Sequence, residues 1–248
     1  MSFQDKLLDS FIAFEQVIDL DNPVHSVRKN ALKRFESDGF PTKKDELWKY
    51  TSIKSIIQKD YSLSVKSNPN VGLKDIEKYS INDIDSYKIV FVDGVFNPFL
   101  SNTTHDGMDI CVLSAALSKT KYKKTITKYF NKIVPDDQSL ASLNTSYTKE
   151  GAYIHIPKSV LPEDPVQILH FSSGKNKPLW LQPRNIIIVE ENARVEIIER
   201  HQSLRSHDGA TNSLTEIYAE KNSFIDYYKI QNDIAVSYTH LRAHETEY

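Results

Sequence analysis

The chain has 248 residues, of which 40% are hydrophobic and 26% charged, with a formal net charge of -2, and this composition is typical of a globular protein with a sizeable core. The near-neutral charge disfavours nucleic acid as a partner, and the lack of a long apolar run disfavours a membrane span. Because a single cysteine, Cys111, excludes an internal disulfide, we expect a cytoplasmic protein.

The N-terminal residues predict two helices. Ser2 and Asp5 are spaced as a capping pair at the start of an apolar stripe that runs through residues 3–18. A second helix is predicted from Asn22-Pro23, which suits a helix start, to Gly39, which suits a helix end. The charged residues on its predicted outer face are Arg28, Lys29, Lys33 and Arg34.

The stretch GFPTKKDELWKYT, residues 39–51, gathers aromatic residues among lysines and acids. Pro41 prevents the preceding helix from continuing, and the spacing of Thr42 and Asp45 predicts a short third helix. Leu47, Trp48 and Tyr50 would pack this helix against the core. We interpret the stretch as structural and assign it no catalytic role.

A β-hairpin and a basic helix are predicted next. YKIVFV, residues 87–92, leads into Asp93-Gly94 and a second apolar segment, which is a strong short-range hairpin signal. A helical apolar pattern follows near residues 122–133. We expect its lysines to be a solvated face; they are Lys121, Lys123, Lys124, Lys128 and Lys132.

From Gly151 the sequence consists of short apolar strands separated by polar turns. Residues 186–199 and 216–229 repeat one another, with the turn residues Asn192 and Asn222 in register. Such repetition predicts parallel, stacked, solenoid-like units whose corners hold asparagine in a left-handed conformation. An antiparallel sandwich or jelly roll is the alternative that this pattern leaves open.

Several residues are candidates for a chemical site. His240 and His244 would share a metal ion if they lay one helical turn apart, but no third ligand is evident nearby. The remaining candidates are interpreted as structural or solvated; they are His155, His170 and His201 on predicted strands, His207 and Asp208 in a loop, and Cys111 as a small buried hydrophobe. We therefore predict no catalytic, cofactor-binding or metal-binding residue in this chain.

Three segments together resemble the SufD family, subunits of the SufBCD iron-sulfur cluster assembly complex. They are RKNALKRFESDGFPTKKDELWKYTSI from residue 28, LNTSYTKEGAYIHIPKSVLPEDPVQILHF from residue 143, and the repeated strands between residues 184 and 233. The resemblance implies an α+β fold in which a mainly helical N-terminal domain, residues 1–150, precedes a truncated right-handed parallel β-helix, residues 151–236. Residues 237–248 resemble a foreign tail, and we expect them to be non-native.

The resemblance also implies a function. It predicts a non-enzymatic scaffold subunit that pairs with SufB-like proteins and a SufC-like ABC ATPase, with an iron-sulfur cluster assembled transiently in the full complex. Family members are longer, and the family's SufC-docking domain and cluster-building histidine lie beyond the matched part. We therefore expect this chain to be a fragment that binds no cofactor alone.

Two other classes of function remain open on sequence alone. A carbohydrate-active enzyme would present acids such as Glu196, Glu199 and Asp226 in a groove formed by the strands. A binding module for nucleic acid or protein would use the lysine-rich helix, and its binding would depend on salt.

Overall fold

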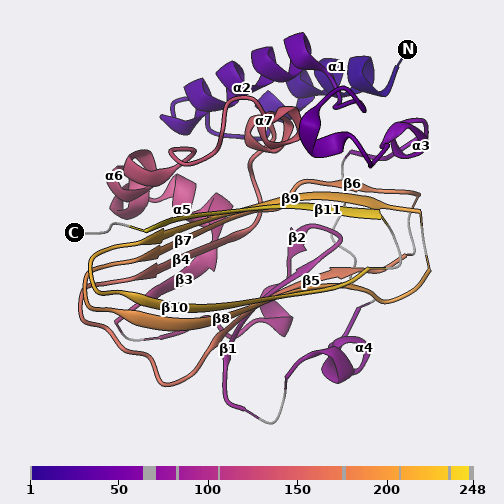
Figure 1. The fold of residues 1–248 in the computed structure, drawn as a ribbon. Helices are drawn as coiled ribbons and strands as arrows, with labels where there is room; N and C mark the ends of the chain where they lie inside the picture. The colour runs from indigo at the N-terminus through magenta and orange to yellow at the C-terminus, as the bar shows by residue number, and fades with distance from the viewer. Residues whose placement is uncertain are drawn as a thin grey trace.

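The structure is a computed structural model that describes residues 2–63, 71–81, 84–105, 107–174, 177–206, 208–233 and 236–245, the last of these ranges by its backbone alone. Two β-sheets face one another at its centre (Figure 1). Sheet 1 has the strand order β10-β8-β5-β1-β2, and sheet 2 the order β11-β9-β7-β4-β3, with β6 also paired to β9. The bounds in sheet 1 are β1 Tyr87–Val92, β2 Val95–Phe96, β5 Val166–Ser172, β8 Arg194–Ser203 and β10 Phe224–Asn232. Those in sheet 2 are β3 Asp109–Val112, β4 Ala152–Ile156, β6 Trp180–Leu181, β7 Arg184–Val189, β9 Ala210–Ala219 and β11 Val236–Glu245.

From β4 onward the chain passes repeatedly from one sheet to the other, and neighbouring strands within each sheet are parallel. The sequence repeat sets the register, since Arg194 lies opposite Phe224 and Arg184 opposite Leu214. The turn residues Asn192 and Asn222 have φ of 59° and 55°, and their side chains are hydrogen-bonded at 3.2 Å. The predicted left-handed asparagine corners and the parallel pairing of the repeats are thus confirmed, and an antiparallel sandwich is excluded for these strands.

The predicted fold class, α+β with a helical domain followed by a β-helix, is wrong. The structure is α/β with two mixed, mostly parallel sheets. The N-terminal part is not a separate helical domain, because its strands β1, β2 and β3 belong to the same two sheets as the later strands. The pairs β1/β2 and β3/β4 are antiparallel. The physical reason is that β4 and β5 would otherwise expose unpaired backbone groups at a sheet edge, and β3 and β1 supply their hydrogen-bond partners.

Helices cover the outer faces of the sheets. Figure 1 shows α1, α2 and α7 over sheet 2, with α4 on the opposite side of the molecule near β1 and β5. The helical bounds are α1 Phe3–Glu15, α2 Val24–Asp38, α3 Lys54–Ile57, α4 Leu73–Ile76, α5 Leu113–Ser118, α6 Thr120–Tyr129 and α7 Ser139–Ser146, with 3-10 turns at Glu46–Trp48, Glu77–Tyr79 and Pro98–Leu100.

The local helix signals are largely confirmed. Ser2 and Asp5 form the predicted capping box, and Gly39, with φ of 67°, ends α2. One expectation for α2 is wrong, because Arg28 is buried and its Nε donates to the carbonyl oxygen of Thr148 at 2.9 Å. Burial lowers the pKa of Arg28 to about 10. A residue that is charged can thus face inward when a carbonyl oxygen of a neighbouring segment accepts its hydrogen bond.

The stretch from Gly39 to Thr51 fastens the N-terminal segment to the sheets, as predicted, but through fewer side chains than expected. Trp48 is buried in a cluster with Leu7, Phe35 and Trp180, whereas Leu47 is 71% and Tyr50 90% exposed. Asp45 accepts a hydrogen bond from the backbone of Thr42 at 2.6 Å, but the turn that follows is a single 3-10 turn, Glu46–Trp48. A single 3-10 turn has too few positions to turn all three large residues inward.

The space between the two sheets has an apolar part and a polar part. Side chains alternate between the two faces of a strand, so Val195, Ile197, Glu199 and His201 of β8 all point inward. Val195 and Ile197 pack with Ile187 of β7. Further along β8, Glu199 accepts a hydrogen bond from Asn185 of β7. The inward positions therefore change from aliphatic to polar toward the carboxyl end of β8.

Candidate functional site

The polar part of the space between the sheets is the main candidate site. It is formed by His170 of β5, by Glu199 and His201 of β8, and by Tyr227 and Lys229 of β10, with sheet 2 contributing Asn185 of β7 and Thr215 of β9. Parallel pairing aligns these strands, since His170 lies directly opposite His201 and Glu199 opposite Lys229. Side chains from five strands thus meet in a region shielded from solvent.

The carboxylate of Glu199 is the centre of this cluster, and both of its oxygens are engaged. Oε2 accepts hydrogen bonds from Asn185 Nδ2 at 3.1 Å, Thr215 Oγ1 at 2.9 Å and the Tyr227 hydroxyl at 2.5 Å. Oε1 lies 2.6 Å from Nε2 of His201 and 2.9 Å from Nζ of Lys229. One oxygen is therefore held by neutral donors, while the other faces the imidazole and the ammonium group.

The two histidines are stacked within an aromatic ladder. The rings of Phe91 and His170 lie 4.9 Å apart, and those of His170 and His201 lie 4.6 Å apart, both nearly parallel. Nε2 of His170 is buried and has no hydrogen-bond partner among the described residues. Buried polar atoms are normally satisfied, and this nitrogen is one of several in the described residues that are not.

The charge states follow from this packing. Burial alone would raise the pKa of Glu199, but the hydrogen bond with His201 and the charge of Lys229 outweigh it and hold that pKa well below the usual value. Burial lowers the pKa of His170 well below its ordinary value, so this ring is neutral near pH 7. Burial and the neighbouring Glu199 raise the pKa of Tyr227, whose hydroxyl therefore remains a donor.

This arrangement has the composition of a metal-ion site. His170, Glu199 and His201 each offer a ligand atom, and the three atoms lie within 4.8 Å of one another. Two imidazoles and a carboxylate are ligands that suit zinc and ferrous ions. From the sequence alone both histidines are expected to be structural or solvated, and no metal ligand is predicted. The signal that could have grouped them is the 31-residue spacing of His170 and His201, which places them side by side on adjacent parallel strands.

The other sequence candidates do not join this cluster. His155 lies 2.9 Å from Glu190 Oε1 and 3.7 Å from Asp109 Oδ2, in an ion-pair setting on β4. His207 is outside the described residues, and Asp208 pairs with Lys59 at 2.6 Å.

The helical arrangement that His240 and His244 would need to share a metal ion, which the sequence already disfavours, does not occur, because the backbone of these residues forms strand β11. Four residues along a strand span about 13 Å, more than twice the rise of one helical turn. Their side chains lie outside what the structure describes.

The structure separates the three acids that a carbohydrate-active enzyme would use. Glu199 is fully buried between the sheets. Glu196 and Asp226 are about half exposed on the other face of sheet 1, where Arg194 binds both, at 3.2 and 3.1 Å. A sheet lies between Glu199 and the other two, so the three carboxylates share no groove.

Cys111 on β3 is half-buried and packs against the apolar cluster under α5 and α6. Burial raises the pKa of its thiol to about 11, so the thiol is protonated near neutral pH. Because a thiolate is the form that binds metals and attacks electrophiles, Cys111 is poorly suited to either role.

The lysine-rich helix α6 packs inward through Tyr122 and Ile126, as predicted. Two of its lysines are bound within the chain, Lys121 to Asp109 at 2.7 Å and Lys128 to Glu220 at 3.3 Å. Because these two charges are paired within the chain, less basic surface is left for an acidic partner.

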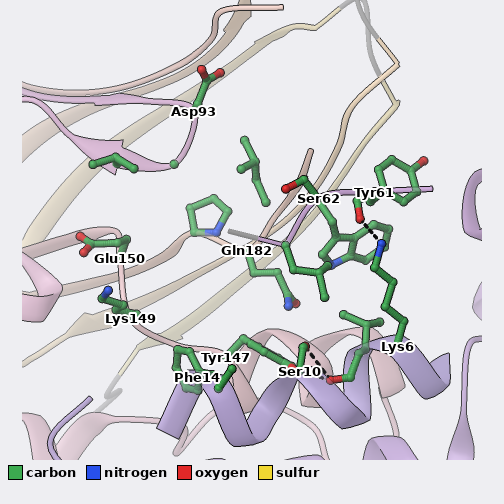
Figure 2. A pocket seen from close by; sticks show the side chains of 18 of the residues that line it. Lys6, Ser10, Phe14, Tyr61, Ser62, Asp93, Tyr147, Lys149, Glu150 and Gln182 are labelled. Carbon is green, nitrogen blue, oxygen red and sulfur yellow. Dashed lines mark hydrogen bonds between the residues drawn. The ribbon is translucent and has the colours of Figure 1, made fainter. Parts of the chain in front are cut away.

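A pocket of about 740 Å³, separate from the cluster around Glu199, lies between α1 and the β1–β2 turn. Figure 2 shows Lys6, Ser10 and Phe14 projecting into it from α1, with Asp93 on the far side and Gln182 between. Burial raises the pKa of Tyr61 and of Tyr147 to about 12 each, so these phenols are hydrogen-bond donors at neutral pH. The pocket could bind a small amphipathic molecule, but its described lining residues bring together no metal-ligand set and no nucleophile with a base.

None of the helices within the described ranges has the length and apolar character needed to cross a membrane.

Comparison with known proteins places the chain in one group. A family model described as "SufBD protein N-terminal region" matches residues 1–168, and one described as "SUF system FeS cluster assembly, SufBD core domain" matches residues 170–247. The two matches follow one another in sequence order and together cover almost the whole chain.

Individual relatives share low identity with the chain. An iron-sulfur cluster assembly SufBD family protein of Synechocystis sp. is 24% identical over 226 residues, 88% of this chain and 49% of the relative. The iron-sulfur cluster assembly protein SufD of Bacillus subtilis is 25% identical over 124 residues (49% of this chain, 27% of the relative), and SufB of the same organism 30% over 101 residues (40% and 21%). The chain thus spans about half the length, or less, of these curated relatives.

Proposed function

The chain belongs to the SufBD family, whose named members are iron-sulfur cluster assembly proteins, and we propose that it acts in that process as a non-enzymatic scaffold of the SufD type. In this proposal it works in the cytoplasm with a SufB-like subunit and a SufC-like ABC ATPase. The observation that carries the proposal is the consecutive match of the two family models over residues 1–168 and 170–247.

The cysteine content supports a scaffold role over direct cluster ligation by this segment. Cys111 is the single cysteine of the chain, and its raised pKa keeps it protonated. A cluster is normally held by several thiolates or by thiolates with histidines. In our proposal the thiolate ligands therefore lie outside residues 1–248.

The SufD-type assignment goes further than family membership, since the chain matches relatives named SufD and relatives named SufB at similar identity. We base it on the residues of the N-terminal helical signature and the repeated strands, which resemble SufD. The structure gives no support to a carbohydrate-active enzyme. Glu199 is buried between the sheets, whereas Asp226 lies on the opposite, exposed face of sheet 1.

The test is co-expression of the complete gene that encodes this chain with its neighbouring genes, with an affinity tag on this subunit. We expect a SufB-like protein and an ABC-type ATPase to co-purify in a defined stoichiometry. Recovery of the tagged subunit without either partner, at protein concentrations where the partners are soluble, would reject the proposed complex. A complex that contains two copies of this chain and the ATPase, without a second SufBD-type subunit, would instead favour a SufB-type role.

A further inference from the structure

The buried cluster around Glu199 contains an unsatisfied ligand atom. His170 is 8% exposed, and the Nε2 atom of its ring has no partner among the described residues. One nitrogen of this ring belongs to the group of three ligand atoms that lie within 4.8 Å of one another. A purely structural histidine in an apolar ladder would normally find a hydrogen-bond partner for its buried nitrogens. The unpaired nitrogen is therefore available as a ligand atom for a bound metal ion.

The carboxylate is pre-oriented as metal ligands usually are. Oε2 of Glu199 is held by Asn185, Thr215 and Tyr227, three neutral donors on three strands. Their hydrogen bonds fix the plane of the carboxylate and direct Oε1 toward His201. Partners of this kind orient a ligating carboxylate, and removing them commonly weakens metal binding about 10- to 100-fold.

Lys229 occupies the position that a cation would take. Its Nζ lies 2.9 Å from Oε1 of Glu199 and is buried, but it makes no hydrogen bond of acceptable geometry among the described residues. The ammonium group thus neutralises the buried carboxylate by charge alone. A divalent ion bound to Oε1 could replace it, since the flexible lysine side chain can withdraw.

A small cavity lies beyond the cluster, next to the inward position of β5 that follows His170. Ser172 follows His170 as the next inward position of β5, and it lines a narrow cavity together with Gly174 and Thr211. That cavity measures about 10 Å³, room for about one water molecule. Ser172 and Thr211 thus place two hydroxyl groups beside this cavity, next to the position of His170 on β5.

We propose that His170, Glu199 and His201 form a binding site for one divalent first-row transition-metal ion, and that Lys229 holds the site closed when the ion is absent. Two histidines with one carboxylate are the ligand set of many ferrous sites. The choice of ferrous iron as the physiological ion rests on the proposed function, in which iron is the cargo. The site itself rests on the geometry alone.

The test uses the purified 248-residue chain, titrated with cobalt(II) and, under anaerobic conditions, with iron(II). We expect one cobalt ion per chain, with visible d–d absorption bands that report nitrogen and oxygen ligation. The double variant His170→Ala/His201→Ala should lose saturable binding. The matched control His155→Gln alters a histidine that is also paired with acids, and it should keep the cobalt stoichiometry and spectrum. The variant His240→Ala/His244→Ala should also keep them, which excludes a site on β11.

Lys229→Met distinguishes a metal site from a merely structural cluster. Because it removes the competing ammonium group, it should raise cobalt affinity by about tenfold or more, equivalent to about 1.4 kcal/mol per factor of ten. Tyr227→Phe removes a hydrogen bond that orients Glu199 and should lower affinity about tenfold.

Histidine-ring ¹⁵N NMR of the unmodified chain tests metal binding directly, without the risk that a substitution disturbs the fold. Addition of zinc(II) should shift the ring signals of His170 and His201 and leave those of His155 in place. Unchanged signals for His170 and His201 at saturating zinc, or equal cobalt binding by the double variant, would overturn the site. Formation of the complex with a SufB-like protein and an ATPase is measured separately, so failure of one proposal does not decide the other.

Discussion

Arg184 and Glu216 form an ion pair, with Nη2 2.5 Å from Oε1, and neither side chain is exposed to solvent. The pair lies where the helical layer meets sheet 2, because Arg184 also donates to Thr145 Oγ1 at 2.8 Å and to Asn131 Oδ1 at 3.1 Å. Its guanidinium group lies over the ring of Phe130, 4.8 Å from the centroid. One buried cation thus connects α7 and the end of α6 to adjacent parallel strands.

We expect loss of either partner of this pair to destabilise the protein strongly. Arg184→Met or Glu216→Gln alone should lower the free energy of unfolding by about 3–5 kcal/mol, because the remaining group stays buried without its partner. The double variant should lose less than the sum of the two single effects. Urea denaturation followed by circular dichroism measures all three.

The control for this experiment is Arg194→Met, which removes the half-exposed ion pairs with Glu196 and Asp226. It should change the unfolding free energy by less than about 1 kcal/mol. Comparable losses at Arg184 and Arg194 would show that burial does not control the strength of these pairs.

The tryptophan and the tyrosine of the stretch WKYT should respond very differently to truncation. Trp48→Ala removes a side chain that is 7% exposed and should cost about 3–5 kcal/mol of unfolding free energy. Tyr50→Ala removes one that is 90% exposed and should change it by no more than about 0.5 kcal/mol. Thermal and urea unfolding of the two variants under the same conditions checks this, and equal effects would contradict the fastening role of Trp48.

Gly151 is predicted to tolerate no side chain. A Cβ atom there would lie 1.9 Å from the carbonyl oxygen of Arg184, and φ is 143°, in the range that favours glycine. Gly151→Ala should therefore destabilise the protein by more than about 2 kcal/mol or prevent soluble expression.

Gly72→Ala is the comparison for this prediction. A Cβ atom at Gly72 meets nothing within 4 Å, and φ is -115°. Its cost should be about 1 kcal/mol or less, the usual preference for glycine over alanine at a helix start. A soluble Gly151→Ala variant as stable as Gly72→Ala would show that β4 and β7 can separate locally at little cost.

Cys111 should react slowly with alkylating reagents in the folded protein. Burial raises its pKa from 9.0 to about 11, so near pH 7.5 the folded chain holds about 100-fold less thiolate than the unfolded chain. Alkylation by iodoacetamide should be at least about tenfold slower in buffer than in urea, and its rate should keep rising with pH until about 11. Mass spectrometry of the labelled chain measures both rates, and rapid labelling of the native chain at pH 7.5 would contradict the inert role assigned to this thiol.

Local chemistry was readable from the sequence where a few adjacent residues decide the structure. The capping pair Ser2 and Asp5, the turn Asp93-Gly94 and the repeated corners Asn192 and Asn222 all have the predicted conformations. Each depends on backbone preferences or hydrogen bonds within a few residues, which sequence spacing records directly.

The helix α7 was not predicted, and the reason is its environment. Its apolar periodicity is weak, since it buries Asn144, Thr145 and Ser146 along with its leucines. Asn144 Nδ2 donates to the carbonyl oxygens of Pro183 and Asn212, at 3.0 and 2.7 Å. Polar residues become core residues there only because strands from elsewhere in the chain supply their partners.

By itself the sequence determined the local turns, the parallel repeat of the strands and the family resemblance, because each depends on residues that are close together or that recur at a fixed spacing. Only the tertiary structure decided that β1, β2 and β3 complete the two sheets and that His170, Glu199 and His201 meet between them. Both outcomes depend on pairing between segments far apart in the chain, where the free energy comes from burial and from satisfied hydrogen bonds. Apart from the 31-residue spacing of His170 and His201, sequence spacing does not record those partners.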